Sequence, residues 1–440
     1  MKLITWRSQL ADFLPFYYGW IIVASTVAVS FSTRTIMAVA TLSVFVVPMT
    51  EELGWSRGLF SGAVSLGGLC AALTSPLVGR WLDRYGSGML IAASSVLTGI
   101  LSIALSLVSN PLAFYFLYAP GRMIFSGPVE LGLPTAISNW FIRRRPLALA
   151  IDSVAKGAGL SVMPLAVQFI ISGWDWRTGW FSLGIITFAL GVVPPMLFMA
   201  RRPEDMGLEP DPVSSDSRET RESIVSTGTR SLEAATEINF TVRQALNTRA
   251  FWILAAFSAA GLMVQAGISL HQVPHYINQG LSGPSAALTA STYAFSQMLG
   301  GPFWSALGRR IPIRFLLACA AFVVAVGAIS TAESASLRTG LLAAAVVGFG
   351  VSGLHLLLRL AWADYYGRQH LGSIRGLTMS AQIGGQALGP IFAGFMFDAT
   401  GSYQLPFRVF AGAACLAGLL VMSATPPKIP APVSVRPTIK

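Results

Sequence analysis

Long apolar runs, each about 20 residues with few charges, constrain this chain more than any other feature. A helix of that length crosses the ~30 Å hydrocarbon core of a bilayer. Hydrophobic residues make up 53% of the 440 residues and charged residues only 11%, against roughly 25% charged in ordinary soluble domains. The chain is therefore predicted to be an all-α integral membrane protein, and a soluble enzyme is excluded.

Twelve apolar runs are candidate membrane-spanning helices, bounded by glycine, proline and charge clusters. The predicted spans are residues 19–47, 58–78, 87–108, 112–138, 147–172, 178–199, 250–279, 285–306, 313–332, 338–362, 374–397 and 403–424.

The positions of Lys and Arg predict the orientation, because cytoplasmic loops retain positive charge. With the N-terminus inside, 22 of the 30 basic residues fall in inner segments and four in outer segments. Four more lie within spans: Arg34, Arg122, Lys156 and Arg359. We therefore expect a multi-pass plasma-membrane protein with both termini in the cytoplasm. The basic excess lies in loops and forms no stripe, so it gives no indication of nucleic-acid binding.

The spans divide into two six-helix halves, residues 1–200 and 250–440, joined by a polar cytoplasmic linker at 201–249. Weak similarity at an offset near 225 aligns Trp140-Phe141 with Tyr365-Tyr366, which predicts a duplicated unit. The three cysteines each lie inside a span, so neither a disulfide framework nor a zinc site is expected.

The most specific motif is a charged sequence between the second and third spans. Glycines permit a tight turn there, and an acid with arginines can form ion pairs and cap helix ends. The sequence reads Gly79-Arg80-Trp81-Leu82-Asp83-Arg84-Tyr85-Gly86. It resembles the signature loop of the major facilitator superfamily; a merely charged loop would explain the arginines but not Asp83 and the spaced glycines.

Further motifs resemble the monocarboxylate-porter and oxalate/formate-antiporter branches of that superfamily, in particular their bacterial members. They are Tyr18-Gly19-Trp20, Gly54-Trp55-Ser56-Arg57, the run from Trp140 to Ala148, Arg202-Pro203-Glu204-Asp205 with Gly207, and the run from Leu371 to Gly376. The resemblance covers essentially the whole chain. It implies a proton-coupled or exchange carrier of small carboxylates in the bacterial inner membrane.

The chain departs from those branches at the residues that hold substrate. The span at 285–306 has no charge, where mammalian-type monocarboxylate porters carry an Arg/Asp pair. The span at 374–397 offers Gln382 and Gln386 where oxalate exchangers use a basic residue. The identity of the substrate therefore does not follow from the resemblance.

Ionisable residues inside spans cost several kcal/mol unless they are paired or hydrated, so each is a functional candidate. Arg34 lies near the middle of the first span, which in this superfamily lines the central cavity. A guanidinium there could bind a substrate carboxylate with two hydrogen bonds. The alternative is a structural pair with another helix.

The tenth span carries His355 and Arg359 one turn apart, so they share a face. We expect them to complete or gate the site, together with Gln265, His271 and Gln382. Arg359 lies near the inner end, and contact with headgroups or cytosol explains it equally well.

Glu130 is the predicted proton site, because burial raises the pKa of a carboxyl and a nearby arginine lowers it. His355 aligns with Glu130 at the offset of 225, which places the two at matching depth. A permanently neutral, hydrogen-bonded acid is the alternative. Arg122 resembles the superfamily's arginine motif of the fourth span and is expected to support Glu130.

Two further pairs have simpler explanations. Asp152 and Lys156, four residues apart, favour a mutually neutralising structural pair over a transport role. His271 and His275 bracket Pro274 and offer too few ligands for a metal, so a polar cavity wall or an extracellular gate is expected.

The sequence thus predicts a major facilitator carrier that moves a small organic anion by alternating access, with a proton and without a cofactor, as a monomer. In this hypothesis the Gly79–Gly86 segment closes the inner gate. An efflux carrier for hydrophobic compounds and a non-transporting sensor are the alternatives. No HExxH, GxSxG or P-loop motif supports an enzyme. The anion hypothesis requires Arg34 and Arg359 to face a water-filled cavity.

Overall fold

The structure is a computed structural model that describes residues 2–142, 144–209, 240–308, 310–367 and 371–427. Every regular element in these ranges is a helix. Nine of the helical runs are long and apolar enough to cross a membrane. The three other predicted spans, at 112–138, 285–306 and 374–397, are also helical but are not among these nine. The all-helical architecture is as predicted, and the count of twelve spans stays a prediction.

The N-terminal helix group comprises α2 to α11 and is preceded by a short surface helix that the sequence analysis did not predict, α1 (Lys2–Phe13). Its elements are α2 (Gly19–Phe31), α3 (Thr33–Ile36), α4 (Val39–Leu53), α5 (Arg57–Tyr85), α6 (Ser87–Leu105), α7 (Pro111–Ile124), the π-helical η1 (Phe125–Val129), α8 (Glu130–Trp140), α9 (Arg145–Gly173), α10 (Trp176–Ile186), the π-helical η2 (Thr187–Val192) and α11 (Val193–Phe198).

The C-terminal helix group comprises α14 to α19, and the short helices η3 (Pro203–Met206) and α13 (Val242–Leu246) lie between the groups. Its elements are α14 (Arg249–Asn278), α15 (Gly283–Leu307), α16 (Ile313–Glu333), α17 (Leu337–Tyr366), α18 (Leu371–Thr400) and α19 (Gln404–Met422). The centre of the predicted linker, 210–239, lies outside the described residues.

Four helices of the first group start 226 residues before a counterpart in the second. The pairs of starting residues are 57 and 283, 87 and 313, 111 and 337, and 145 and 371. This spacing agrees with the offset near 225 found in the sequence and supports the predicted duplication.

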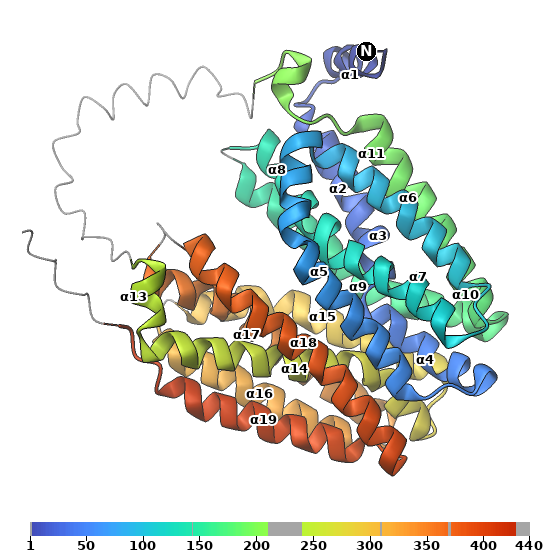
Figure 1. Cartoon of the computed structure of the whole chain (residues 1–440), viewed down its shortest axis with the longest axis vertical. Helices are drawn as coiled ribbons and strands as arrows, with labels where there is room; N and C mark the ends of the chain where they lie inside the picture. Colours follow the sequence, from blue (N-terminus) through green and yellow to red (C-terminus); the bar gives the residue numbers. More distant parts are fainter. Residues whose placement is uncertain (1, 143, 210–239, 309, 368–370, 428–440) are drawn as a thin grey trace, which may run out of the picture.

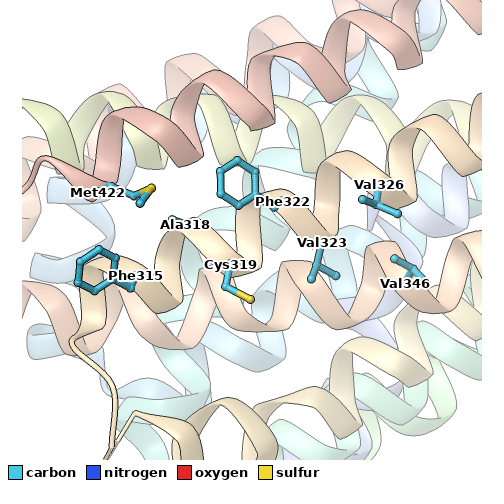
Figure 2. A pocket seen from close by; sticks show the side chains of 8 residues that line it. All are labelled: Phe315, Ala318, Cys319, Phe322, Val323, Val326, Val346 and Met422. Atoms are coloured by element: carbon cyan, nitrogen blue, oxygen red, sulfur yellow. The ribbon is translucent and has the colours of Figure 1, made fainter.

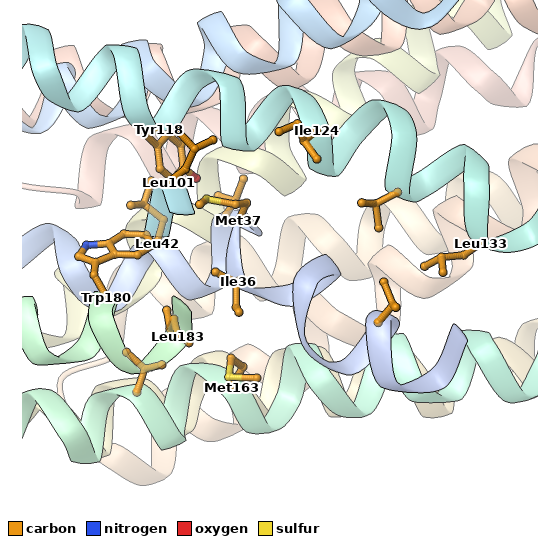
Figure 3. Packing of buried hydrophobic residues seen from close by; sticks show 14 of the residues in the cluster. Ile36, Met37, Leu42, Leu101, Tyr118, Ile124, Leu133, Met163, Trp180 and Leu183 are labelled. Atoms are coloured by element: carbon orange, nitrogen blue, oxygen red, sulfur yellow. The ribbon is translucent and has the colours of Figure 1, made fainter. Parts of the chain in front are cut away.

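The two helix groups meet at one end and diverge at the other (Figure 1). At the closed end, Arg57 to Ser65 of α5 pack against Ala387 to Asp398 of α18, and α9 packs against α15. At the open end, opposite, α8 ends at Trp140 and α17 ends at Tyr366. Each group has its own apolar core, and Figure 3 shows the N-terminal one around Ile36 and Met37.

Glycines let the long helices approach at their contacts. A Cβ on Gly159 of α9 would lie 2.6 Å from Thr35 and 3.0 Å from the Phe31 carbonyl oxygen. A Cβ on Gly157 would lie 2.9 Å from Met298 of α15. The Gly157-Ala158-Gly159 segment therefore holds α9 against both α2–α3 and the C-terminal helix group.

Candidate functional site

The predicted first span is not one continuous helix, because its backbone breaks on both sides of Arg34. The chain leaves helical geometry at Ser32 and again between Met37 and Ala38, so Arg34 lies in the one-turn helix α3. Hydroxyl side chains satisfy the backbone: Ser32 Oγ donates to the Ala28 carbonyl at 2.7 Å, and Thr41 Oγ1 donates to the Thr35 carbonyl at 2.7 Å. Side chains can replace helix bonds in this way inside a membrane.

Glu130 also lies at a helix irregularity. The π-helical segment η1 contains Pro128, which has no N–H to donate, and Glu130 is the first residue of α8 after it. Single π-turns of this kind often occur at functional sites. The irregularity directs the Glu130 side chain toward α3 and α9.

Four charged side chains form one ion-pair network between α3, α8 and α9. Arg34 contacts Glu130 Oε2 through Nε at 2.9 Å and through Nη2 at 2.7 Å. Arg34 Nη1 contacts Asp152 Oδ2 at 3.0 Å, and Lys156 Nζ contacts Glu130 Oε1 at 3.0 Å. Two cations and two carboxylates balance, which offsets the cost of placing them at membrane depth.

This network corrects two predictions. Arg34 is only 4% exposed and is held by two carboxylates, which agrees with the alternative of a structural pair with other helices. The requirement that both Arg34 and Arg359 face a water-filled cavity is therefore not met at Arg34, and any anion site must rely on other cations. Asp152 and Lys156 do not form the predicted pair with each other, because each binds a partner on another helix. The accessible members of the network are Lys156 and Glu130, whose side chains are 31% and 39% exposed.

The C-terminal helix group places His355 and Arg359 of α17 toward the same charges. His355 Nε2 lies 2.7 Å from Gln265 Oε1 of α14, and Arg359 Nε donates to the His355 carbonyl at 3.1 Å. The charges of Lys156, Arg359 and Glu130 act on His355, and those of Arg375 and Glu130 act on Arg359. Both side chains are exposed, and Arg359 forms no ion pair among the described residues. Gln382 of α18 is half-buried.

Arg122 does not support Glu130 directly. It is buried, its Nη1 donates to the Met37 carbonyl at 3.2 Å, and its guanidinium lies 4.5 Å from the centre of the Phe125 ring. Within the described part of the chain it pairs with no carboxylate. Arg122 instead stabilises the backbone break after α3, and so acts on the segment that carries Arg34.

His271 lies in the closed end and is fully buried, so in this conformation it contacts protein and not substrate. Its ring lies 3.2 Å from Ser61 Oγ of α5, 3.2 Å from the Tyr403 hydroxyl and 3.1 Å from the Pro390 carbonyl. His275 Nε2 lies 2.8 Å from the Thr331 carbonyl. This position fits the gate alternative for His271 better than substrate binding.

The segment predicted as a charged loop is mostly helix. α5 continues through Gly79 and Asp83 to Tyr85, the Arg84 guanidinium lies 5.4 Å from the Tyr85 ring, and Gly86 alone makes the turn before α6, with φ of +83°. The prediction that the helix ends at residue 78 is wrong, because glycines in an apolar bundle do not by themselves end a helix. The side chain of Asp83 lies outside the described set.

Two apolar hollows of the surface are lined by none of these charges. One groove of about 380 Å³ runs along α16, between Phe315 and Val326 (Figure 2), and no charged side chain lines it. A second, of about 500 Å³, lies between α9 and α15, with Phe169 and Phe295 in its wall. Apolar grooves of this kind suit lipid chains and not an anion.

The sequence analysis did not select Asp398, which joins the two helix groups. Its carboxylate accepts hydrogen bonds from the backbone N–H groups of Arg57 at 3.0 Å and Gly58 at 2.9 Å. The only sequence signal was a lone acid one residue beyond the predicted span 374–397.

The helical architecture and the paired charges at membrane depth are those of a polytopic membrane transporter. The chain belongs to the Major Facilitator Superfamily, whose profile matches residues 24–280 and 272–440. It is therefore a multi-pass membrane transporter and not an enzyme.

Similar proteins place the chain near the monocarboxylate transporters. Monocarboxylate transporter 11 of Mus musculus is 24% identical over 405 residues, which cover 89% of this chain and 84% of that protein. Monocarboxylate transporter 12-B of Danio rerio is 24% identical over 427 residues, covering 92% and 87%. The solved structure of the peptide transporter POT in complex with sulfate has a TM-score of 0.70 at 16% identity, covering 94% and 97% of the two chains, and shows the same fold.

Proposed function

We propose that this transporter carries a small monocarboxylate together with a proton by alternating access. The helix groups within residues 1–200 and 250–440 would move as two units around a site between Lys156, Glu130, His355 and Arg359. The observation that carries this proposal is the Glu130 carboxylate, which Arg34 and Lys156 share.

Protonation of Glu130 would prepare Lys156 for the substrate. With Glu130 ionised, the four charges of the network balance. With Glu130 neutral, Arg34 keeps Asp152 at 3.0 Å, and Lys156 is left without a carboxylate partner. An unpaired ammonium at this depth is costly, so a substrate carboxylate that contacts Lys156 would restore the balance. One proton and one anion then bind together with no net charge.

Arg359 and His355 would close the site from the C-terminal helix group. Arg359 is exposed and forms no ion pair among the residues described, so it can donate to an anion without breaking an existing pair. A guanidinium binds a carboxylate with two parallel hydrogen bonds. Gln265 fixes the His355 ring from the neighbouring helix.

The closed end would face the outside and the open end the cytoplasm. In the orientation predicted from the basic residues, Arg57 lies outside and the segment of Arg144 and Arg145 lies inside. The structure then corresponds to the inward-facing state of a monomer in the plasma membrane.

Uptake into proteoliposomes tests this function. Labelled lactate and pyruvate are supplied with and without an acidic exterior, and a lipophilic cation is supplied in parallel. We expect the carboxylates to accumulate only with the pH gradient. Movement of the cation alone would contradict the proposal and favour the efflux alternative.

Glu130→Gln separates proton coupling from transport as such. Because the amide cannot ionise, we expect accumulation driven by the pH gradient to vanish. Glu333→Gln is the matched control, since Glu333 lies on the surface in an exposed pair with Arg408. Accumulation by Glu130→Gln equal to that of the Glu333→Gln control would refute the assignment of the proton to Glu130.

A further inference from the structure

The N-terminus of α5 receives its hydrogen-bond acceptor from the other helix group. The first N–H groups of any helix lack partners within the helix, and they carry a partial positive charge. Here the Asp398 carboxylate of α18 accepts from Arg57 N at 3.0 Å through Oδ1 and from Gly58 N at 2.9 Å through Oδ2. We call this arrangement the Asp398 cap.

Two glycines make the Asp398 cap possible. A Cβ on Gly58 would lie 2.8 Å from Asp398 Oδ2. A Cβ on Gly394, one turn before Asp398, would lie 2.6 Å from Ser61 Oγ and 3.0 Å from the Gly58 Cα. Backbone therefore approaches backbone across the boundary between the helix groups, with no room for a side chain.

Other side chains surround the Asp398 cap. The Arg57 guanidinium lies 5.5 Å from the centre of the Phe397 ring, and its Nη1 is buried with no hydrogen-bond partner among the described residues. Tyr403, the residue before α19, and Glu51 of α4 act electrostatically on Arg57. His271 of α14 lies 3.2 Å from Ser61, one turn further along α5.

We propose that Asp398 is the gate residue that holds the closed end shut, in a transport cycle of the kind proposed above. The cap joins the two helix groups through backbone amides that opening must release. Asp398 is exposed, so water can replace its backbone partners when the closed end opens. A second hydrogen bond between the helix groups lies deeper in the same contact, where the buried Ser65 Oγ donates to the Ala387 carbonyl at 2.6 Å. Opening thus exchanges two charge-assisted hydrogen bonds for water.

The ionised carboxylate is the stronger acceptor, so replacing it by a neutral amide weakens the closed state. The amide of an asparagine keeps the shape of the side chain, but its oxygen carries no charge and the helix terminus loses its counter-charge. A residue that served only the packing of α18 would tolerate this substitution without any change at the gate.

Cysteine accessibility measures the opening without any substrate. Cys70, Cys319 and Cys415 are replaced by serine, and Ala387→Cys places a thiol in the contact below the Asp398 cap. A membrane-impermeant maleimide is added on the side of the closed end. Ala399→Cys, at an exposed position on the same side, corrects for the reactivity of the reagent.

We expect Asp398→Asn to raise the corrected labelling rate about tenfold at neutral pH, because the charge-assisted bonds are lost. Gly58→Ala, which displaces the carboxylate sterically, should raise labelling while keeping Asp398 intact.

Asp175→Asn is the matched control, because Asp175 also caps a helix, but within its own group: Oδ1 accepts from Thr178 N at 2.6 Å. It should leave labelling unchanged. Equal labelling of Asp398→Asn and the parent overturns the gate proposal whatever the protein transports. If labelling changes in Asp398→Asn but the protein takes up no carboxylate, the proposed substrate is refuted and the gate proposal is still supported.

Discussion

The two helix groups share one architecture but differ in how regular their helices are. In the N-terminal helix group, three helical runs are interrupted: at α3, at η1 and at η2. In the C-terminal helix group, α14 to α19 are each one uninterrupted element, although Pro274, Pro302 and Pro390 lie inside them. Proline alone therefore does not decide where these helices break.

The interruptions coincide with the charged chemistry. Arg34 lies in α3 and Glu130 directly follows η1, while η2 approaches α3, where Gly191 leaves room for Thr33. Irregular backbone at membrane depth is tolerated where protein or water satisfies it. The comparison indicates that the N-terminal group provides the adaptable charged wall of the site and the C-terminal group a more rigid one.

The largest expected effect comes from removing the central cation. Arg34→Ala leaves Glu130 and Asp152 without their shared partner, and breaking a buried pair in this way costs about 3–5 kcal/mol. We expect a strongly lowered melting temperature in detergent and no transport. Arg408→Gln breaks an exposed pair in the C-terminal group and should cost about 0–1 kcal/mol. A similar drop in melting temperature for both variants would contradict the central role of Arg34 in the ion-pair network.

The second prediction tests whether the irregular backbone of η1 serves transport and not the stability of the protein. Pro128→Ala restores an N–H within η1 and favours a regular helix, which turns Glu130 away from Lys156. We expect transport to fall about tenfold while the melting temperature stays level or rises. Pro302→Ala, on an exposed face of the regular helix α15, should change neither. Unaltered transport in Pro128→Ala would show that η1 has no part in placing Glu130.

The third prediction concerns His355 and its partner Gln265 in the more regular C-terminal helix group. Gln265→Leu removes the side-chain partner of His355, so the ring is no longer fixed beside Arg359. We expect KM for the carboxylate to rise about three- to tenfold with little change in kcat, as for loss of a hydrogen bond that orients a binding group. Ser296→Ala, which removes a bond to the Ala345 carbonyl within the same helix group, is the control. A change confined to kcat would argue against this role.

The smallest expected effect compares one helix cap in each group. The Thr178 N–H holds the pKa of Asp175 below its usual range, so the cap contributes stability above the unfolded pKa and loses it as the pH falls through the folded pKa. Asp175→Ala should cost about 1 kcal/mol at neutral pH and less in acid. Ser336→Ala, at the capping box of α17, should cost about the same at every pH. Thermal unfolding at neutral and acidic pH distinguishes the two.

The positions of the helices could be predicted because they follow from the length of the apolar runs and from the glycine, proline and charge clusters that bound these runs. The helical runs agree with the predicted spans except at two ends, where α4 continues to Leu53 and α5 to Tyr85 instead of ending at residues 47 and 78. The breaks around Arg34 could not be predicted, because Ser32 and Thr41 repair the backbone with hydroxyl groups that scarcely change hydropathy. The family resemblance read from the motifs is confirmed by the match over both halves.

The sequence analysis named the charged residues of the proposed site, but it could not predict how they pair. Spacing along α9 places Asp152 and Lys156 on one face, yet which helix lies opposite that face is a property of the tertiary fold. Glu130 from α8 therefore competes successfully for Lys156. Asp398 escaped selection for the same reason, since its partners are backbone amides 341 and 340 residues away.

The single-residue turn at Gly86 has a mechanical consequence. A Cβ there would lie 2.8 Å from Arg201 Cγ, so α5, α6 and the segment that leaves α11 converge on one point with no slack between them. A tilt of α5 that starts at its amino end must also move α6, because no flexible loop separates the two helices. Movement at one surface of the bundle must then displace the helix ends at the opposite surface.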